Sequence, residues 1–128
     1  MNDAASQQTD PAFPILDLEA ALEHTGGDRE LLQQLCSVFA EECPKQLEEV
    51  RTAVESRAPN SVHRAAHKIK GSTSVVGGMQ ASQAAMQLEK AALSGDMQLI
   101  EAAWASLSQA VGELQTSVVK LADSEALT

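Results

Sequence analysis

The stretch of this sequence that could do chemistry runs from His63 to Ser72 and centres on His67. A helix turns by about 100° per residue, and the apolar positions around His67 define one buried side. On such a helix His67 points about 140° away from the centre of that side. An exposed imidazole is a nucleophile at neutral pH because its ordinary pKa is about 6.5, and it can carry a covalent intermediate. His67 is therefore a candidate acceptor for a transferred group.

The neighbours of His67 on this helix suit a phosphoryl group. Lys70 lies one turn on and is expected to be an exposed surface lysine; with Arg64 and Lys68 it can neutralise phosphoryl oxygens. Gly71 lies directly above His67 on the same face of the helix. A glycine inside a helix destabilises it by about 0.8–1 kcal/mol relative to Ala, so its presence needs a reason. Either a partner approaches closely at this point, or a neighbouring helix packs there. The outward direction of Gly71 favours the approach of a partner.

The elements that must position these residues are predicted to be helices. Good helix formers dominate, and aromatic residues make up only 2 % of the sequence. Apolar residues recur in steps of three and four over four segments, which is the period of an amphipathic helix. These segments cover residues 28–56, 62–76, 79–93 and 97–121. Because their connections are short, we expect an all-α fold: an antiparallel up-down-up-down four-helix bundle with a short N-terminal lid helix.

The chain is predicted to form one domain with two short extensions. Residues 1–14 are expected to be a flexible lead-in, residues 15–122 the bundle, and residues 123–128 a tail. Three aspartates suit helix N-caps. They are Asp17, Asp28 and Asp96.

The segment 28–56 contains a proline at Pro44, inside its apolar stripe. We expect one helix that bends there, because the stripe continues in phase; two helices that break near Pro44 are the alternative. The stripe also contains apolar positions that are expected to face the core. They are Leu31, Leu35, Phe39, Cys43, Leu47, Val50 and Val54.

Composition excludes several classes of partner. The formal net charge of −9 argues against nucleic acid and anionic membranes, and no apolar run approaches the length of a membrane span. Cys36 and Cys43 are seven residues apart on one helix, too far to pair with each other, so two reduced, half-buried thiols are expected. The polar start shows no signal peptide. A cytoplasmic location is therefore predicted.

The segment Ala66 to Ser72, followed by Val76-Gly77, resembles the signature of histidine-containing phosphotransfer (HPt) domains. The resemblance extends from about Asp17 to Leu121. It also takes in the Gly26-Gly27-Asp28 turn, the helix interrupted by Pro44, Leu88-Glu89 and Gly95-Asp96.

The resemblance implies a role for several residues. His67 would be phosphorylated through Nε2, Lys70 would stabilise the phosphoryl group, and Gly71 would admit the partner. Glu89 would hydrogen-bond the other ring nitrogen and so fix the tautomer; a solvated surface charge is the alternative for this residue. The family often has an acidic residue before the histidine-bearing helix, where this chain has Asn60, which is expected to cap the helix.

The resemblance also implies the reaction and the partners. The chain would accept a phosphoryl group from a receiver-domain aspartate and pass it to another receiver domain. Its partners would be receiver domains of response regulators and of a hybrid sensor histidine kinase, which supply the Mg²⁺; no cofactor or metal of its own is expected. Arg64, Lys68, Gly71 and Ser74 are the predicted partner-binding residues. A monomer is expected, either free-standing or as part of a hybrid kinase.

Three other functions fit parts of the sequence. His63 and His67 are four residues apart and could share a metal ion, but no further ligands are apparent. A kinase is disfavoured because the sequence has no glycine-rich phosphate loop. A helical interaction module without phosphotransfer remains the alternative to a carrier, and the presence of His67, Lys70 and Gly71 together speaks against it.

Overall fold

The computed structural model describes residues 13–123 of the chain, and all regular structure in that range is helical. The predicted all-α fold is therefore confirmed. Of the predicted lead-in and tail, residues 1–12 and 124–128 lie outside the described residues. The helices are α2 (Leu18–His24), α3 (Arg29–Glu55), α4 (Pro59–Val75), α5 (Met79–Ser94) and α6 (Met97–Ala122).

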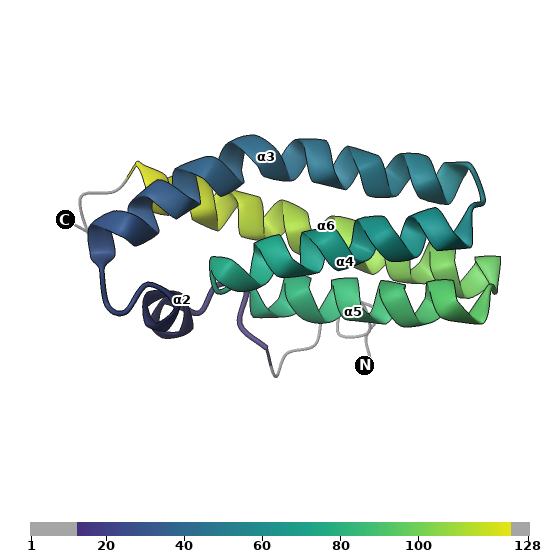
Figure 1. Ribbon diagram of the computed structural model, residues 1–128, viewed down its shortest axis with the longest axis horizontal. Coiled ribbons are helices and arrows are strands. Elements are labelled where there is room, and N and C mark those ends of the chain that lie inside the picture. The colour runs from purple at the N-terminus through teal and green to yellow at the C-terminus, as the bar shows by residue number, and fades with distance from the viewer. Residues whose placement is uncertain (1–12, 124–128) are drawn as a thin grey trace, which may run out of the picture.

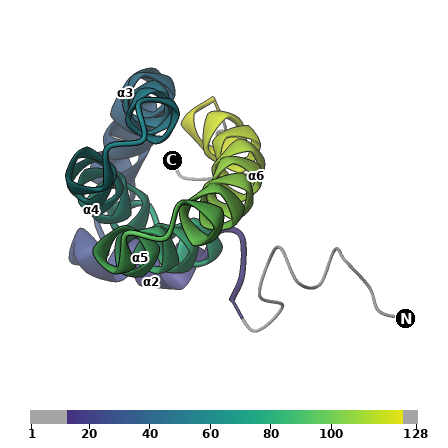
Figure 2. The ribbon, with the colours of Figure 1, turned by 90° about the vertical axis from the view of Figure 1, so that its right-hand side faces the viewer.

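The four long helices lie side by side, and consecutive helices run in opposite directions (Figure 1). Seen along their length, α3, α4, α5 and α6 follow one another around a ring, and α6 packs against α3 (Figure 2). The short helix α2 lies at one end, where it contacts α3 and α4. Within the described residues, no helix has the length and apolar character needed to cross a bilayer.

Most predicted helix starts are confirmed by side-chain caps. The N-cap aspartates that accept hydrogen bonds from the first turn are Asp17 of α2, Asp28 of α3 and Asp96 of α6. The prediction that Asn60 caps α4 is wrong. Pro59 occupies the first position of α4, where its fixed φ and missing N–H are tolerated, so the N-cap is Ala58 and has no side-chain hydrogen bond.

Helix α3 continues through Pro44, so the prediction of a single helix is confirmed. A proline inside a helix leaves the carbonyl four residues earlier without its usual donor. Here that carbonyl belongs to Ala40, and it accepts a hydrogen bond from Gln115 Nε2 at 2.8 Å. The proline therefore frees an acceptor that ties α3 to α6.

The core is aliphatic and runs through all four long helices. Its largest fully buried side chains include Leu32, Ile69, Leu88, Ile100, Leu107 and Leu114. The predicted stripe of α3 was wrong at its start, because Leu31 is 41 % exposed while its neighbour Leu32 is completely buried. The difference is one helical position, which rotates a side chain by about 100°.

The two cysteines are free thiols in the core of α3. Both are buried, whereas half-buried thiols were expected. Burial raises the pKa of Cys43 to about 11 and raises that of Cys36 as well. The thiolate is the reactive form of cysteine, so both side chains are unreactive core residues at neutral pH.

The turn between α4 and α5 is fixed by its contact with the segment that leads into α2. Asp17 N–H donates to the carbonyl of Gly77 at 2.7 Å. Gly77 has a φ of +76°, and a Cβ at this position would collide with the carbonyl oxygen of Asp17. Only glycine suits both conditions. This contact holds α2 against the end of the helix that bears His67.

Candidate functional site

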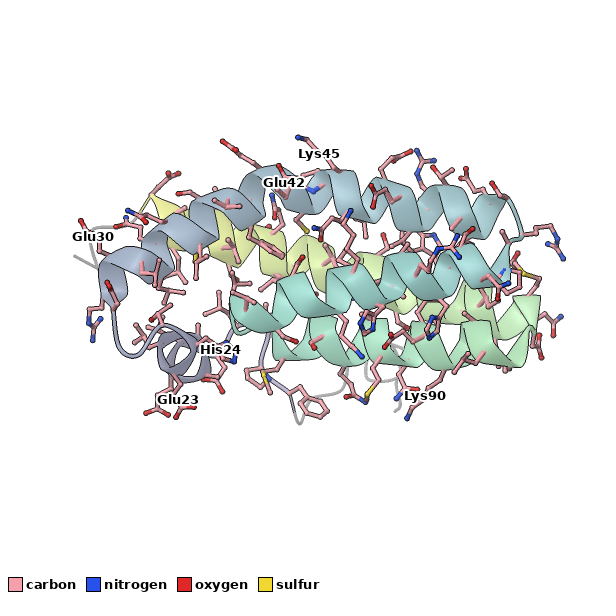
Figure 3. The ribbon with its side chains drawn as sticks, viewed as in Figure 1. Glu23, His24, Glu30, Glu42, Lys45 and Lys90 are labelled. Atoms are coloured by element: carbon pink, nitrogen blue, oxygen red, sulfur yellow. The ribbon has the colours of Figure 1, made fainter. Side chains whose placement is uncertain are left out.

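His67 lies in the middle of α4, on the flank that faces α5. Its side chain is 68 % exposed, so the predicted outward direction is confirmed. Ala66 and Ile69, on either side of it in the sequence, are completely buried and anchor the helix in the core. The imidazole is thus presented to solvent from a helix rather than from a loop. Figure 3 shows the side chains along the helices, with Lys90, the residue after Glu89 on α5, labelled.

Glu89 of α5 holds the inner nitrogen of the His67 ring. Glu89 Oε2 lies 2.7 Å from His67 Nδ1, and the Glu89 residue is only 7 % exposed. The alternative interpretation of Glu89 as a solvated surface charge is therefore wrong. An ionised carboxylate can only accept hydrogen bonds, so Nδ1 carries the proton and the lone pair of a neutral ring lies on Nε2.

Lys70, one turn after His67, binds the second oxygen of the same carboxylate. Lys70 Nζ lies 2.7 Å from Glu89 Oε1, and the lysine side chain is 31 % exposed. It was expected to be an exposed surface lysine, and that expectation is wrong, because it is half-buried between α4 and α5. His67, Glu89 and Lys70 therefore form one hydrogen-bonded network, with the carboxylate at its centre.

The charge of Glu89 follows from this network. Burial on its own would raise the pKa of the Glu89 carboxyl. Hydrogen bonds from Lys70 and from His67, together with the positive charge of the lysine, outweigh that effect, so the pKa lies below its ordinary value. Glu89 is ionised at neutral pH, which is what the tautomer of His67 requires.

A second contact between α4 and α5 defines their register. The hydroxyls of Ser74 and Ser82 lie 2.7 Å apart. Ser74 follows His67 by seven residues, and Ser82 precedes Glu89 by seven residues, so the antiparallel register is constant between the two contacts. Ser74 is half-buried and also bonds the carbonyl of Lys70 at 2.9 Å, so the structure places it within the helix packing, two turns from His67.

Gly71 leaves an open space beside His67. It is exposed, and a Cβ at this position would meet no atom within 4 Å other than the nearby backbone of its own helix. Packing of a neighbouring helix is thus not the reason for glycine here. The approach of a partner, the other explanation, remains a prediction.

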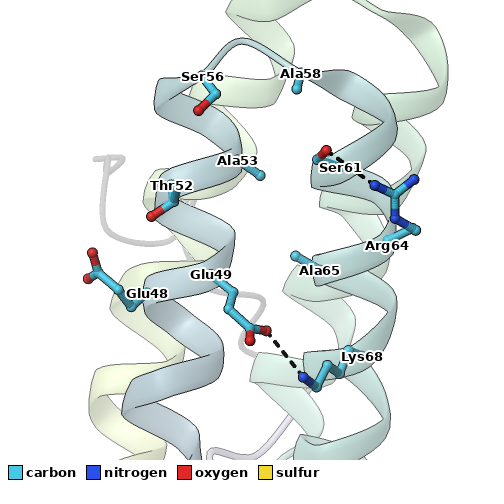
Figure 4. Close-up of a pocket in the computed structure, with 10 residues that line it drawn as sticks. All are labelled: Glu48, Glu49, Thr52, Ala53, Ser56, Ala58, Ser61, Arg64, Ala65 and Lys68. Carbon is cyan, nitrogen blue, oxygen red and sulfur yellow. Dashed lines mark hydrogen bonds and ion pairs between the residues drawn. The ribbon is translucent and has the colours of Figure 1, made fainter.

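Arg64 and Lys68 lie on the other flank of α4, facing α3. Lys68 Nζ pairs with Glu49 of α3 at 3.2 Å, and Arg64 donates to Ser61 at 3.3 Å. Both cations line a groove of about 490 Å³ between α3 and α4 (Figure 4). The structure therefore separates these two predicted partner-binding residues from the network of His67, Lys70 and Glu89.

No residue spacing within one helix could have indicated the bond between Lys70 and Glu89. The two residues lie on different helices, and only the register of α4 against α5 brings them together. Within residues 13–123, no three His, Cys, Asp or Glu side chains are grouped so that they could hold a metal ion. The site as described consists of a nucleophilic ring nitrogen, a buried carboxylate and a lysine.

Comparison with protein families gives a match. A protein-family model described as the Hpt domain matches residues 34–118, which is more than half of the chain and includes His67, Lys70, Gly71 and Glu89. Neither the curated proteins nor the solved structures gave a significant match.

Proposed function

Because this chain belongs to the Hpt domain family, whose members are histidine phosphotransfer modules of phosphorelays, we propose that it carries a phosphoryl group on His67. The donor is a receiver-domain aspartyl phosphate, and the acceptor is the aspartate of another receiver domain. The observation that carries the proposal is the bond from His67 Nδ1 to the buried Glu89, which leaves Nε2 exposed and nucleophilic. The chain is a carrier rather than a catalytic enzyme.

The step that we propose balances without a further reactant. The lone pair of His67 Nε2 forms a bond to phosphorus, and the bond from phosphorus to the aspartyl oxygen breaks. The electron pair of that bond leaves with the aspartate carboxylate. Nδ1 keeps its proton, the ring becomes positively charged, and Glu89 stabilises that charge at 2.7 Å. Transfer to the next receiver is the same step in reverse.

The remaining site residues have supporting roles in this proposal. Lys70 has three N–H donors and uses one of them on Glu89, so the others can bind phosphoryl oxygens. Gly71 gives the receiver access to His67. We propose that the two surface cations of α4, Arg64 and Lys68, are receiver contacts. Ser74 belongs to the packing around the site. Each receiver supplies its own aspartate and Mg²⁺.

The proposal includes the organisation of the chain and its setting. Residues 15–122 form one domain, with the four long helices as an up-down-up-down bundle and α2 as its lid. The domain acts as a monomer in the cytoplasm, and its partners are receiver domains of response regulators and of a hybrid sensor histidine kinase. An interaction module that binds receivers without chemistry is the second candidate, and the network around His67 favours the carrier.

Phosphotransfer profiling tests this proposal. Each receiver domain encoded in the same genome is phosphorylated with acetyl phosphate and mixed with the wild-type chain or with His67→Gln. We expect at least one receiver to label the wild type with an acid-labile, base-stable phosphoryl group, and none to label the variant. If receivers bind the wild type but never label it, the chain is an interaction module.

A further inference from the structure

Leu93, in the last turn of α5, is the most exposed large apolar side chain among residues 13–123, at 75 %. It lies one turn after Glu89, and residues four apart share one face of a helix. Glu89 and Ser82 both contact α4, so Leu93 continues the line along α5 that borders the helix of His67. An isolated exposed leucine needs no explanation, but its position beside the site gives this one a consequence.

The register of α5 against α4 places Leu93 relative to His67. The two contacts between these helices keep a constant antiparallel register. Leu93 lies four residues after Glu89, and His63 lies four residues before His67, so Leu93 is level with His63 along the two helices. In the opposite direction along α4, Gly71 leaves an open space. Along the bundle, the exposed Leu93 therefore lies about one turn from His67 in one direction, and the open space at Gly71 lies one turn from it in the other.

The charges around this surface differ from those of the chain as a whole. The chain has a formal net charge of −9, whereas α4 has three basic residues and no acidic one. Residues 71–88 have no charged side chain at all. Glu89, the acidic residue of the site, is buried and paired with Lys70. Residues 59–88, which include the whole helix of His67, contain no acidic residue, and the cations Lys68 and Lys70 are each paired with a glutamate. An acidic partner, such as the phosphorylated pocket of a receiver, therefore meets no acidic side chain of this segment.

We infer that Leu93 and Gly71 fix the direction in which a receiver domain docks on His67. An apolar depression of the receiver covers Leu93, and the main chain beside its aspartate approaches over Gly71. The inference rests on the proposed function of His67 as the phosphoryl carrier. Covering the leucine stabilises one docked orientation only. A receiver turned by 180° would leave Leu93 in water, and most of the receiver would lie on the side of His67 away from Leu93.

Transfer kinetics with the best receiver from the profiling experiment test this inference. Leu93→Glu is compared with Val119→Glu, which makes the same kind of change at an exposed position of α6, a helix that packs against α3 and α5. We expect Leu93→Glu to raise the KM for the phosphorylated receiver by about tenfold or more, with little change in the maximal rate. Leu93→Met, which stays apolar, and Val119→Glu should keep the wild-type KM.

Loading by phosphoramidate separates docking from chemistry. This small phosphoryl donor needs no docking surface, so it should label His67 equally in the wild type and in Leu93→Glu. An equal KM for Leu93→Glu and Val119→Glu would overturn the docking inference and leave the carrier proposal intact. Slow labelling of Leu93→Glu by phosphoramidate would also overturn it, because the substitution would then act on His67 itself. A wild-type chain that no receiver labels would overturn the carrier proposal, and the docking inference with it.

Discussion

Two lysine–glutamate pairs on opposite flanks of α4 use the same residue types in different environments. Lys68 and Glu49 lie 3.2 Å apart across the groove to α3, and both side chains are more than half exposed. Lys70 and Glu89 lie 2.7 Å apart between α4 and α5, where the carboxylate is 10 % exposed and also binds His67. Two helical positions turn a side chain by about 200°, which is enough to move it from one environment to the other.

The difference separates the cation that shares a carboxylate with His67, which is Lys70, from the one that does not, which is Lys68. An exposed ion pair contributes little, because water and salt screen it. A carboxylate that is buried needs its partners, because losing one leaves a charge with too few hydrogen bonds. The pair on the α5 side therefore sets the state of His67, and the pair on the α3 side belongs to the surface.

The largest expected effect comes from Glu89→Gln. The carboxylate accepts hydrogen bonds from both Lys70 and His67, one on each oxygen, whereas an amide has only one oxygen. If that oxygen binds the lysine, the NH₂ group of the amide faces Nδ1 of His67. The ring then favours the tautomer with its proton on Nε2. We expect phosphoryl transfer to slow by about tenfold or more. Glu49→Gln, the matched change in the surface pair, should transfer at the wild-type rate. Equal rates for the two variants would contradict the distinction between the pairs.

Lys70→Ala and Lys68→Ala compare the two cations directly. Loss of the Lys70 bond to a buried carboxylate should lower the free energy of unfolding by about 1–2 kcal/mol, and transfer should slow severalfold. Lys68→Ala should stay within about 0.5 kcal/mol of the wild type, since its pair is exposed. Urea denaturation and transfer rates check both variants. A larger loss of stability or of transfer rate in Lys68→Ala than in Lys70→Ala would contradict the distinction between the two cations.

Gly71→Gln and Gly112→Gln separate helix propensity from access to His67. Gly71 in α4 and Gly112 in α6 are both exposed, and a Cβ would meet nothing within 4 Å at either position. Each substitution should stabilise the isolated chain by about 0.5–1 kcal/mol. Only Gly71→Gln should weaken receiver binding, measured by calorimetry. Unchanged receiver affinity in Gly71→Gln would refute the role of Gly71 in admitting the partner.

The smallest expected effect is a pH dependence of stability. The pKa of Glu89 is lowered in the folded chain, so its ionised form stabilises the fold at pH values above the ordinary glutamate pKa of about 4.3. This contribution is lost as the pH falls through the folded pKa. The free energy of unfolding of the wild type should therefore fall more between about pH 6 and pH 3 than that of Glu89→Gln. Parallel pH curves for the two proteins would show that Glu89 has no such role.

The sequence was sufficient to predict features that depend on one helix. The outward direction of His67 and the exposure of Gly71 follow from the helical period once the buried side of α4 is known. The N-caps of α2, α3 and α6 depend on local chemistry and were also predicted. The N-cap of α4 was not predicted correctly, because Pro59 and Asn60 both suit a helix start and the proline takes the first position.

Features that depend on two helices could not be predicted in the same way. The burial of Glu89 and its bond to Lys70 arise from the register of α5 against α4, and no periodicity within either helix contains that register. The position of Leu93, level with His63, has the same origin. The prediction for the start of the α3 stripe was wrong for a related reason. Leu31 and Leu32 are equally apolar, and only the neighbours they pack against decide which one is buried.

The most direct test of the central claim is to locate the transferred phosphoryl group at atomic resolution. The chain is labelled with ¹⁵N-histidine, phosphorylated by its receiver, and examined by NMR for coupling between ³¹P and a ring nitrogen. We expect coupling to Nε2 of His67, with the proton retained on Nδ1 opposite Glu89. Coupling to Nδ1 of His67, or to His24 or His63 instead, would contradict it.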